Sequence, residues 1–192
     1  QCLKTCLEIK KIEGFIVALS VEDSLFKSSP YFNHTKLIGI AKGGSERYHS
    51  VLSALNTLNK IAKPNDWILV HDSVRPCIKS KDIEMLINEV IKHPIGGILA
   101  TKIVDTIKKI DDNGKISTVD RQKLYKAQTP QMFRFKILKD ALNNAIRLGN
   151  HITDESEAIE NLGHSIKIVV GSSSNIKITR KDDLKLANHY LQ

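Results

Sequence analysis

Cysteine is scarce in the sequence, and the chain has only Cys2, Cys6 and Cys77. These three form neither a CxxC pair nor the spacing of a metal-ligand set. Secreted domains that rely on disulfides carry an even and denser set, so the pattern speaks against a disulfide framework. We therefore expect a protein of a reducing compartment.

Long hydrophobic runs are also absent. No apolar stretch approaches the roughly 18 residues of a membrane-spanning helix. The opening residues have neither the apolar core of a secretory signal nor the Arg/Ser bias of a transit peptide. The hydrophobic share of 41% and the charged share of 26% are typical of soluble globular proteins. With 192 residues, we expect one domain, residues 1–192, and no membrane partner.

Aromatic residues make up only 5% of the chain, which leaves few platforms for stacking nucleic-acid bases. The 29 Lys and Arg residues exceed the 21 Asp and Glu residues and give a net charge of +8. They are spread along the whole chain instead of forming one basic stripe. We therefore predict no nucleic-acid partner, and a small polyanionic substrate explains the positive charge equally well.

The sequence does contain an alternation of short apolar runs and amphipathic segments. The runs predict buried strands, while Val51, Leu55 and Leu58 recur on one face of a helix. Strands that alternate with helices predict an α/β fold with a mainly parallel sheet covered by helices. The predicted strands are 15–19, 37–41, 67–70, 97–104, 124–128 and 166–170, and the predicted helices are 2–12, 46–61, 81–91, 135–148, 154–162 and 181–191.

One stretch breaks this alternation. Two short apolar segments, 106–110 and 116–119, flank Asn113-Gly114, and an Asn-Gly pair is a strong signal for a β-hairpin. A hairpin inserted into an α/β pattern does not easily join the central sheet. We therefore predict a projecting arm over residues 103–121, and such an arm is expected to contact a partner subunit.

The chain opens with a helix, although a helix in a parallel sheet normally connects two strands. Its first residue, Gln1, is not an initiator methionine. We therefore expect a strand and the turn after it to precede residue 1.

Ligands of open α/β sheets bind outside the carboxyl ends of the strands, so polar residues after each apolar run are the first candidates. After strand 37–41, the sequence Gly43-Gly44-Ser45-Glu46-Arg47 leads directly into a helix. Its bare backbone amides and the positive end of the helix dipole suit an anion. A flexible turn with Ser45 as the helix cap explains the same residues equally well.

A second candidate follows strand 67–70, where the sequence is His71-Asp72-Ser73-Val74-Arg75-Pro76. It places a carboxylate and a guanidinium together at a strand end. Asp72 is a candidate Mg²⁺ ligand among phosphate oxygens, because hard cations prefer oxygen ligands. The alternatives are a turn-capping role for Asp72 and a hydrogen-bonded, half-buried side chain for His71.

Weaker candidates lie further along the chain. Asp105-Thr106 and Asp120-Arg121 occupy the two ends of the predicted arm, and Thr129-Pro130 and Thr153-Asp154-Glu155 follow later. Thr153 or Asp154 would also serve as an ordinary cap for helix 154–162. In Asn175-Ile176-Lys177-Ile178 a lysine lies between two apolar residues, and a solvated lysine on an edge strand is the alternative.

Taken together and in this order, these segments resemble the 2-C-methyl-D-erythritol 4-phosphate cytidylyltransferases of the non-mevalonate isoprenoid pathway. The resemblance runs from about Gly14 to the end of the chain. Each piece alone is common, whereas the whole set in register is specific. The pieces are Gly43-Gly44-Ser45-Glu46-Arg47 with Ser50, His71-Asp72-Ser73-Val74-Arg75-Pro76, Asp105-Thr106, Thr118-Val119-Asp120-Arg121, Thr129-Pro130-Gln131, Ile152-Thr153-Asp154-Glu155 and Asn175-Ile176-Lys177.

The resemblance implies a single Rossmann-like α/β nucleotidyltransferase domain whose arm crosses to the second subunit of a homodimer. It implies transfer of the cytidylyl group of CTP to methylerythritol phosphate, with release of pyrophosphate and with Mg²⁺ as the divalent cation. Gly44, Ser45 and Ser50 would lie along the cytosine and ribose of CTP. Asp72 and Ser73 would meet the ribose and a magnesium-bound phosphate.

The same resemblance implies which residues hold the second substrate. Methylerythritol phosphate would be bound by Asp72, Arg75 and Thr153, with Thr129 lining the site. Lys177 is matched to a residue that orients the attacking phosphate. The arm residues Asp105, Thr106 and Arg121 would reach the substrate in the neighbouring subunit, and the catalytic candidates are Lys177, Arg121 and Asp72.

The family's first strand, its Gly-rich loop with a basic residue over the triphosphate, and a following lysine are expected to precede residue 1. We expect a cytoplasmic protein, with the plastid stroma as the alternative. The nearest rival function is a cytidylyltransferase acting on another sugar-alcohol phosphate, such as ribitol 5-phosphate. A non-catalytic nucleotide-binding or dimerisation module is the rival from another class.

Overall fold

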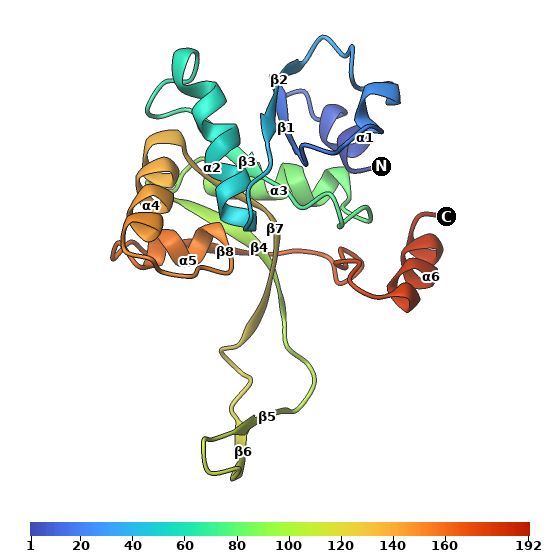
Figure 1. The fold of residues 1–192 in the computed structure, drawn as a ribbon. Helices are drawn as coiled ribbons and strands as arrows, with labels where there is room; N and C mark the ends of the chain where they lie inside the picture. The colour runs from blue at the N-terminus through green and yellow to red at the C-terminus, as the bar shows by residue number, and fades with distance from the viewer.

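The computed structural model describes all of residues 1–192, with strands in the middle, helices around them and a long extension on one side (Figure 1). The helices are α1 (Cys2–Leu7), α2 (Arg47–Thr57), α3 (Ser80–Val90), α4 (Phe135–Arg147), α5 (Glu155–Glu160) and α6 (Lys181–Tyr190), with the short 3₁₀ turns η1 (Phe26–Ser28) and η2 (Leu58–Lys60). The strands are β1 (Phe15–Leu19), β2 (Leu37–Lys42), β3 (Trp67–Val70), β4 (Gly96–Lys102), β5 (Ile107–Ile110), β6 (Ile116–Val119), β7 (Tyr125–Arg134) and β8 (Lys167–Val170).

The central sheet has four strands in the order β3-β7-β4-β8. Strands β4 and β8 are parallel, whereas β7 runs antiparallel to both of its neighbours. Strands β1 and β2 form a separate parallel pair, against which α2 packs. The predicted α/β architecture is therefore present, and the antiparallel β7 adds a mixed character that the alternation of strands and helices did not predict.

Strand β7 is also longer than the predicted run 124–128, because it continues through Thr129-Pro130 to Arg134. Proline has no N–H for the strand ladder, so its position in the sequence indicated the end of a strand. The register between β4 and β7 shifts at this point, and Leu99 alone faces Gln128, Thr129 and Pro130. This bulge leaves part of β7 out of the ladder and free to face a ligand.

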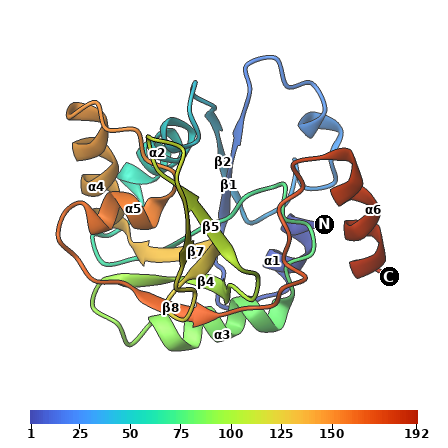
Figure 2. The same ribbon diagram turned by 90° about the horizontal axis from the view of Figure 1, so that it is seen from below.

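The sheet is covered by helices on both faces. Figure 2 shows α3 beneath the sheet and α2, α4 and α5 on the opposite side. Met132 and Phe133, adjacent in β7, belong to different buried clusters, as the alternation of side chains along a strand requires. None of the helices combines the length and the apolar character needed to cross a bilayer.

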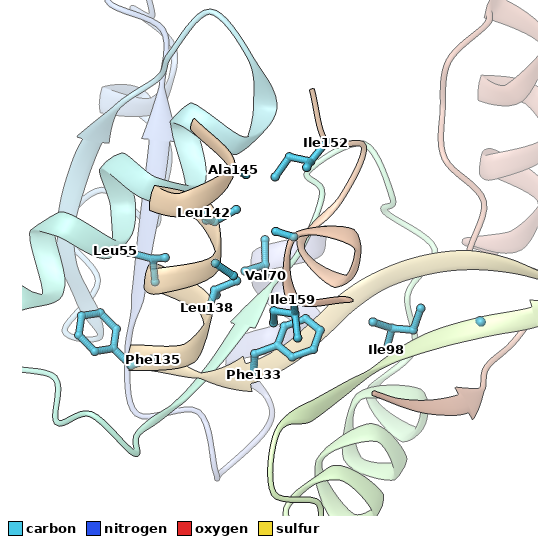
Figure 3. Close-up of a cluster of buried hydrophobic side chains, with 13 residues drawn as sticks. Leu55, Val70, Ile98, Phe133, Phe135, Leu138, Leu142, Ala145, Ile152 and Ile159 are labelled. Carbon is cyan, nitrogen blue, oxygen red and sulfur yellow. The ribbon is translucent and has the colours of Figure 1, made fainter. Parts of the chain in front are cut away.

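The larger cluster joins α2, α4 and α5 to the sheet (Figure 3). Leu55, Leu138, Leu142 and Ile159 are each at most 2% exposed and belong to this cluster together with Phe133. Full burial of a side chain of this size contributes about 1.5–3 kcal/mol. The smaller cluster beneath the sheet is built on the buried face of α3, with Ile83, Leu86, Ile87 and Val90.

Most predicted helices are confirmed within a few residues, and α1 differs most. It ends at Leu7 instead of residue 12, because the chain turns there and buries Ile9 in the cluster between the sheet and α3. Helix α2 ends at Thr57 and passes into η2. Helix α4 ends just before Gly149, whose φ of +66° is a conformation that favours glycine.

The predicted hairpin is confirmed as a projecting arm. Strands β5 and β6 pair only with each other and stand away from the rest of the molecule (Figure 1). At the tip, Asp111 Oδ1 accepts hydrogen bonds from the backbone N–H groups of Asn113 and Lys115, and Gly114 has a φ of +79°. These contacts form the tight turn that the Asn-Gly pair predicted.

Candidate active site

An open polar cleft of about 160 Å³ lies where the end of β3 and the bulge of β7 meet the start of α5. Only one of its lining residues is hydrophobic, so the cleft suits a charged or strongly polar ligand. Its position beyond the carboxyl end of β3 is the one expected for α/β sheets. The lining residues are Arg47, Asp72, Arg75, Ala127, Gln128, Thr129, Gln131, Thr153, Asp154 and Lys177.

Three positively charged side chains lie around the carboxylate of Asp72. Its Oδ1 accepts a hydrogen bond from Arg47 Nε at 2.7 Å, and its Oδ2 lies 3.2 Å from Lys177 Nζ and 3.7 Å from Arg75 Nε. Burial by itself would raise the pKa of Asp72, but the positive charges of Arg47 and Lys177 outweigh it and hold that pKa below its usual value. Asp72 is therefore an anion at neutral pH.

Arg75 and Asn175 anchor the segment that carries Lys177. Arg75 is 6% exposed and donates from Nη1 to the Asn175 carbonyl at 2.9 Å. Asn175 is fully buried and donates from Nδ2 to the Thr129 carbonyl at 2.9 Å. Lys177 thus extends from a fixed stretch of backbone, while its own side chain is 43% exposed.

Thr129 comes from the bulge of β7 and fixes the backbone of Asp72. Its Oγ1 accepts a hydrogen bond from the Asp72 N–H at 3.0 Å and lies 3.0 Å from His71 Nδ1. Burial lowers the pKa of His71 to about 4, although the charge of Asp72 opposes this. The imidazole of His71 is therefore neutral at pH 7. It is hydrogen-bonded and half-buried, as the alternative interpretation of His71 expected.

The start of α5 forms another wall of the cleft. Asp154 is the N-cap of α5, and its Oδ1 accepts a hydrogen bond from the Glu157 N–H at 2.9 Å. The backbone N–H and the hydroxyl of Thr153 both donate to Glu157 Oε2. Gln131 Nε2 donates to Asp154 Oδ2 at 2.8 Å and ties this turn to β7. The capping role considered for Asp154 is confirmed, and Thr153 still lines the cleft.

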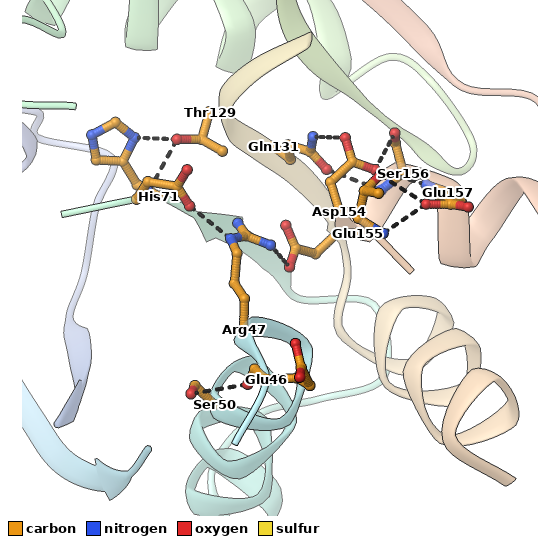
Figure 4. A network of polar contacts seen from close by, with 12 residues as sticks. Glu46, Arg47, Ser50, His71, Thr129, Gln131, Asp154, Glu155, Ser156 and Glu157 are labelled. Atoms are coloured by element: carbon orange, nitrogen blue, oxygen red, sulfur yellow. Dashed lines mark hydrogen bonds and ion pairs between the residues drawn. The ribbon is translucent and has the colours of Figure 1, made fainter. Parts of the chain in front are cut away.

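Two charged residues of this site were not among the predicted site residues. Figure 4 shows Arg47 reaching from the start of α2 toward Glu155. Arg47 Nη1 donates to Glu155 Oε1 at 2.5 Å, and the Glu155 side chain is fully buried. Burial raises the pKa of Glu155, while the charge of Arg47 opposes the rise. The available signal was that Arg47 ends the motif Gly43–Arg47 and Glu155 ends the motif Ile152–Glu155, but their contact joins residues 108 positions apart along the chain.

The family model of 2-C-methyl-D-erythritol 4-phosphate cytidylyltransferase matches residues 1–192. The chain is 52% identical over 191 residues to the protein of that name from Ruthia magnifica subsp. Calyptogena magnifica, with 100% of this chain and 80% of the relative covered. It superimposes on the Francisella tularensis 2-C-methyl-D-erythritol 4-phosphate cytidylyltransferase with a TM-score of 0.84 at 34% identity, covering 98% of this chain and 85% of that one. A crystal structure of a 4-diphosphocytidyl-2C-methyl-D-erythritol synthase gives a TM-score of 0.87 at 31% identity, covering 100% and 88%.

The chain belongs to the 2-C-methyl-D-erythritol 4-phosphate cytidylyltransferase family.

The match to the family model confirms the family expected from the sequence, and the superposition on a solved structure confirms the expected nucleotidyltransferase fold. Five predicted substrate-binding residues of the chain line a single cleft. They come from the turn after β3, the bulge of β7, the residue before the α5 cap and the segment after β8. These residues are Asp72, Arg75, Thr129, Thr153 and Lys177.

Gly44 and Ser45, which were predicted to lie along the nucleotide, are in the turn between β2 and α2, and Ser50 is in the first turn of α2. The Gly44 N–H donates to Ser50 Oγ at 2.9 Å, and Ser45 Oγ lies 3.2 Å from His49 Nδ1. Only Arg47 of this segment lines the cleft itself. The alternative in which Ser45 caps the helix is wrong, because the N-cap of α2 is Glu46 and no side chain caps this helix.

The remaining predicted residues do not line the cleft of their own chain. Ser73 is exposed after β3, and its carbonyl accepts a hydrogen bond from Cys2 Sγ at 3.2 Å. Asp105, Thr106 and Arg121 are exposed on the arm, which leads away from the cleft (Figure 1). Their predicted role therefore depends on a second subunit.

Asp72 was the predicted Mg²⁺ ligand, and its surroundings allow a test of that role. No group of three or more His, Cys, Asp and Glu side chains is placed to hold a metal ion. Asp154, the other carboxylate of the cleft, already accepts hydrogen bonds at both oxygens. Mg²⁺ is commonly held by one or two carboxylates together with phosphate oxygens of the substrate. Asp72 therefore fits a Mg²⁺ ion that arrives with a nucleotide, whereas the protein alone does not build a metal site.

Proposed function

We propose that this chain transfers the cytidylyl group of CTP to 2-C-methyl-D-erythritol 4-phosphate, giving 4-diphosphocytidyl-2-C-methyl-D-erythritol and pyrophosphate for isoprenoid precursor biosynthesis. The observation that carries this proposal is the convergence of Asp72, Arg75, Thr129, Thr153 and Lys177 on one polar cleft. A relative 52% identical to the chain carries the name of this activity.

The chemistry of the transfer matches what the cleft offers. A phosphate oxygen of methylerythritol phosphate attacks the α-phosphorus of CTP and forms a new P–O bond. The bond from the α-phosphorus to the oxygen shared with the β-phosphate breaks, and its electron pair leaves with pyrophosphate. A phosphate monoester has a second pKa of about 6, so the attacking group is mostly ionised at neutral pH and needs no general base. The protein must mainly position the reactants and neutralise charge.

Three side chains of the cleft are suited to hold the attacking phosphate. Arg75 is fixed by its bonds to the carbonyls of Asn175 and Ala127 and offers a stationary positive charge. Lys177 is more exposed and has only Asp72 as a charged partner, so it is free to turn toward a phosphate. Thr153 lines the same cleft, and its hydroxyl, which here donates to Glu157 Oε2, would donate to the phosphate after rotation. We assign the orienting role to Lys177 and the fixed charge to Arg75.

We extend the proposal to Mg²⁺ as the divalent cation, with Asp72 as its protein ligand. When bound, the ion would supply positive charge to the phosphates of CTP. The position of Asp72 beyond the end of β3 supports this assignment. Loss of activity in excess EDTA, restored by Mg²⁺, is the expected outcome, and unchanged activity in EDTA would contradict it.

We also propose a homodimer in which the arm completes the partner's site. The arm exposes apolar side chains, with Val104 76%, Ile110 65% and Ile116 63% exposed, and water-exposed apolar groups favour burial against a partner. Asp105, Thr106 and Arg121 would then reach the substrate bound by the other subunit. We place the protein in the cytoplasm, which its three free cysteines support.

Shared sites can be tested by mixing two inactive variants, Lys177→Ala and Arg121→Ala, under conditions that exchange subunits. A mixed dimer has one site with both substitutions and one site with neither. With random exchange, half of the dimers are mixed and each has one intact site, so about one quarter of wild-type activity is expected to return. Activity that stays at the level of the separate variants would contradict a shared site.

The activity itself is tested by pyrophosphate release from CTP and Mg²⁺ with either methylerythritol phosphate or ribitol 5-phosphate. Release with methylerythritol phosphate alone is the expected result. Release with ribitol 5-phosphate alone would assign the chain to the rival activity. Binding of CTP without release from either substrate would instead indicate a non-catalytic nucleotide-binding module.

A further inference from the structure

Arg47 makes an unusual contact, because its guanidinium joins two carboxylates that come from different parts of the fold. Its Nε donates to Asp72 Oδ1 at 2.7 Å and its Nη1 donates to Glu155 Oε1 at 2.5 Å. Arg47 is the first residue of α2, Asp72 follows β3, and Glu155 is the first residue of α5. One side chain therefore fixes three walls of the cleft relative to one another.

The burial of the Glu155 carboxylate lowers the free energy of unfolding. Glu155 is 0% exposed, and its second oxygen, Oε2, is buried without a hydrogen-bond partner. A buried charge with incomplete hydrogen bonding lowers stability, and replacement of a whole buried ion pair by packed apolar residues is often neutral or even stabilising. Stability alone therefore does not explain a glutamate here, whereas its contact with Arg47 gives it a function.

The three cations around Asp72 differ in how firmly they are held. Arg47 is held by a second ion pair with Glu155, and Arg75 is held by two backbone carbonyls. Lys177 has no charged partner other than Asp72 and is 43% exposed. A ligand phosphate would therefore draw Lys177 away from Asp72 Oδ2 most easily, while Oδ1 stays bound to Arg47.

We propose that Arg47 and Glu155 are positioning residues of the transfer reaction. Glu155 holds Arg47 in place, and Arg47 binds Asp72 Oδ1, so that Oδ2 is the carboxylate oxygen left to contact the ligand. This inference rests on the proposed cytidylyl transfer. It also couples the turn at Gly43–Ser45, which directly precedes α2, to the acidic centre of the cleft. Neither residue needs to touch the substrate for this role.

The geometry requires arginine and not merely a positive charge. Two different nitrogens of one planar guanidinium each serve one carboxylate, and arginine offers donors in such a fixed fork. A lysine ammonium is a compact charge on a flexible stem and does not hold two carboxylates in this arrangement. The contact with Glu155 likewise needs a carboxylate to keep the guanidinium in place.

The test uses Arg47→Lys, Glu155→Gln and the double variant in the full chain, with Lys136→Met as the matched control. Lys136 forms an exposed ion pair with Asp140 on α4, at 2.7 Å and away from the cleft. For each protein we would measure kcat and KM for pyrophosphate release, the Kd for CTP alone, and the melting temperature. The control is expected to match the wild type in all of them.

Arg47→Lys is expected to lower kcat about a hundredfold, because a small misplacement of a positioned group has effects of that order. Glu155→Gln is expected to lower kcat about tenfold, since the amide oxygen still accepts the hydrogen bond without its charge. The Kd for CTP and the KM for methylerythritol phosphate should change by less than about threefold. Because loss of one charge of a buried ion pair is destabilising, the melting temperature of Glu155→Gln should fall. Its kcat, measured well below that temperature on folded protein, should still be about tenfold lower, which a merely structural role would not produce.

The double variant should be no slower than Arg47→Lys alone, because both substitutions break one chain of contacts. Folded single variants with wild-type kcat, or a kcat that falls only in step with the melting temperature, would overturn the inference. If Glu155→Gln does not fold, the buried charge serves stability and the inference is overturned for Glu155, while Arg47→Lys still decides it for Arg47. A wild-type protein that releases no pyrophosphate would instead refute the proposed function itself.

Discussion

Replacing Lys177 by alanine separates catalysis from stability more cleanly than any other change in the cleft. The lysine Nζ lies 3.2 Å from Asp72 Oδ2, and its side chain is 43% exposed. A partly exposed ion pair of this kind contributes at most about 1 kcal/mol to folding, which corresponds to a melting temperature lower by roughly 2–4 °C in a chain of this size. The Lys177→Ala protein should therefore fold normally.

The effect on catalysis should be much larger. Loss of one group that stabilises the developing charge of the transition state typically costs about 2.7–4 kcal/mol, or a factor of 10²–10³ in kcat. Arg75 cannot replace the lysine, because its guanidinium is held by the carbonyls of Asn175 and Ala127. Steady-state pyrophosphate release at saturating CTP and methylerythritol phosphate measures the loss directly.

The matched control for this experiment is Lys136→Met, which breaks an exposed lysine–aspartate pair outside the cleft. It should leave kcat unchanged and alter the melting temperature as little as Lys177→Ala does. A Lys177→Ala protein with kcat within a few-fold of the wild type would refute the orienting role of Lys177. A large fall in melting temperature together with kcat would show that the lysine acts through the fold.

Three further predictions follow from the structure. Asn175→Ala leaves the buried carbonyl of Thr129 without its side-chain donor, so denaturant unfolding should show a loss of about 1–3 kcal/mol, against little change for the exposed Asn143→Ala. Burial raises the pKa of the Cys6 thiol to about 12, so the unfolded chain loses this proton first, and wild-type stability should fall between pH 9 and pH 12 by up to about 4 kcal/mol more than that of Cys6→Ala; parallel pH curves would contradict this. Ile110→Asp combined with Ile116→Asp places charge on the exposed apolar part of the arm and should shift sedimentation from dimer to monomer, whereas an unchanged dimer would locate the interface elsewhere.

Much of the fold could be predicted from the sequence because its signals are local. Apolar runs marked β1, β2, β3 and β8, and the periodic faces of α3 and α4 marked helices whose sides are now buried. The Asn113-Gly114 turn predicted the arm. The course of β7 could not be predicted, because Pro130 suggests an interruption and only the pairing with β3 and β4 shows that the strand continues through a bulge.

The site was predictable to the extent that its residues follow strand ends or stand in motifs. Asp72, Arg75, Thr129, Thr153 and Lys177 were found in this way and line one cleft. The contact of Arg47 with Glu155 was not found, because it joins residues that are distant in the sequence and depends on how α2 and α5 pack. Periodicity identifies which face of a helix is buried, but it does not identify the partner of a single charge at the start of a helix.

The most direct test of the central claim is mass-spectrometric detection of the product formed from CTP and methylerythritol phosphate by the full chain with Mg²⁺. We predict that 4-diphosphocytidyl-2-C-methyl-D-erythritol appears together with an equal amount of pyrophosphate, and that Lys177→Ala forms it at least about a hundredfold more slowly. Absence of this product from a folded wild-type protein that binds CTP would contradict the account.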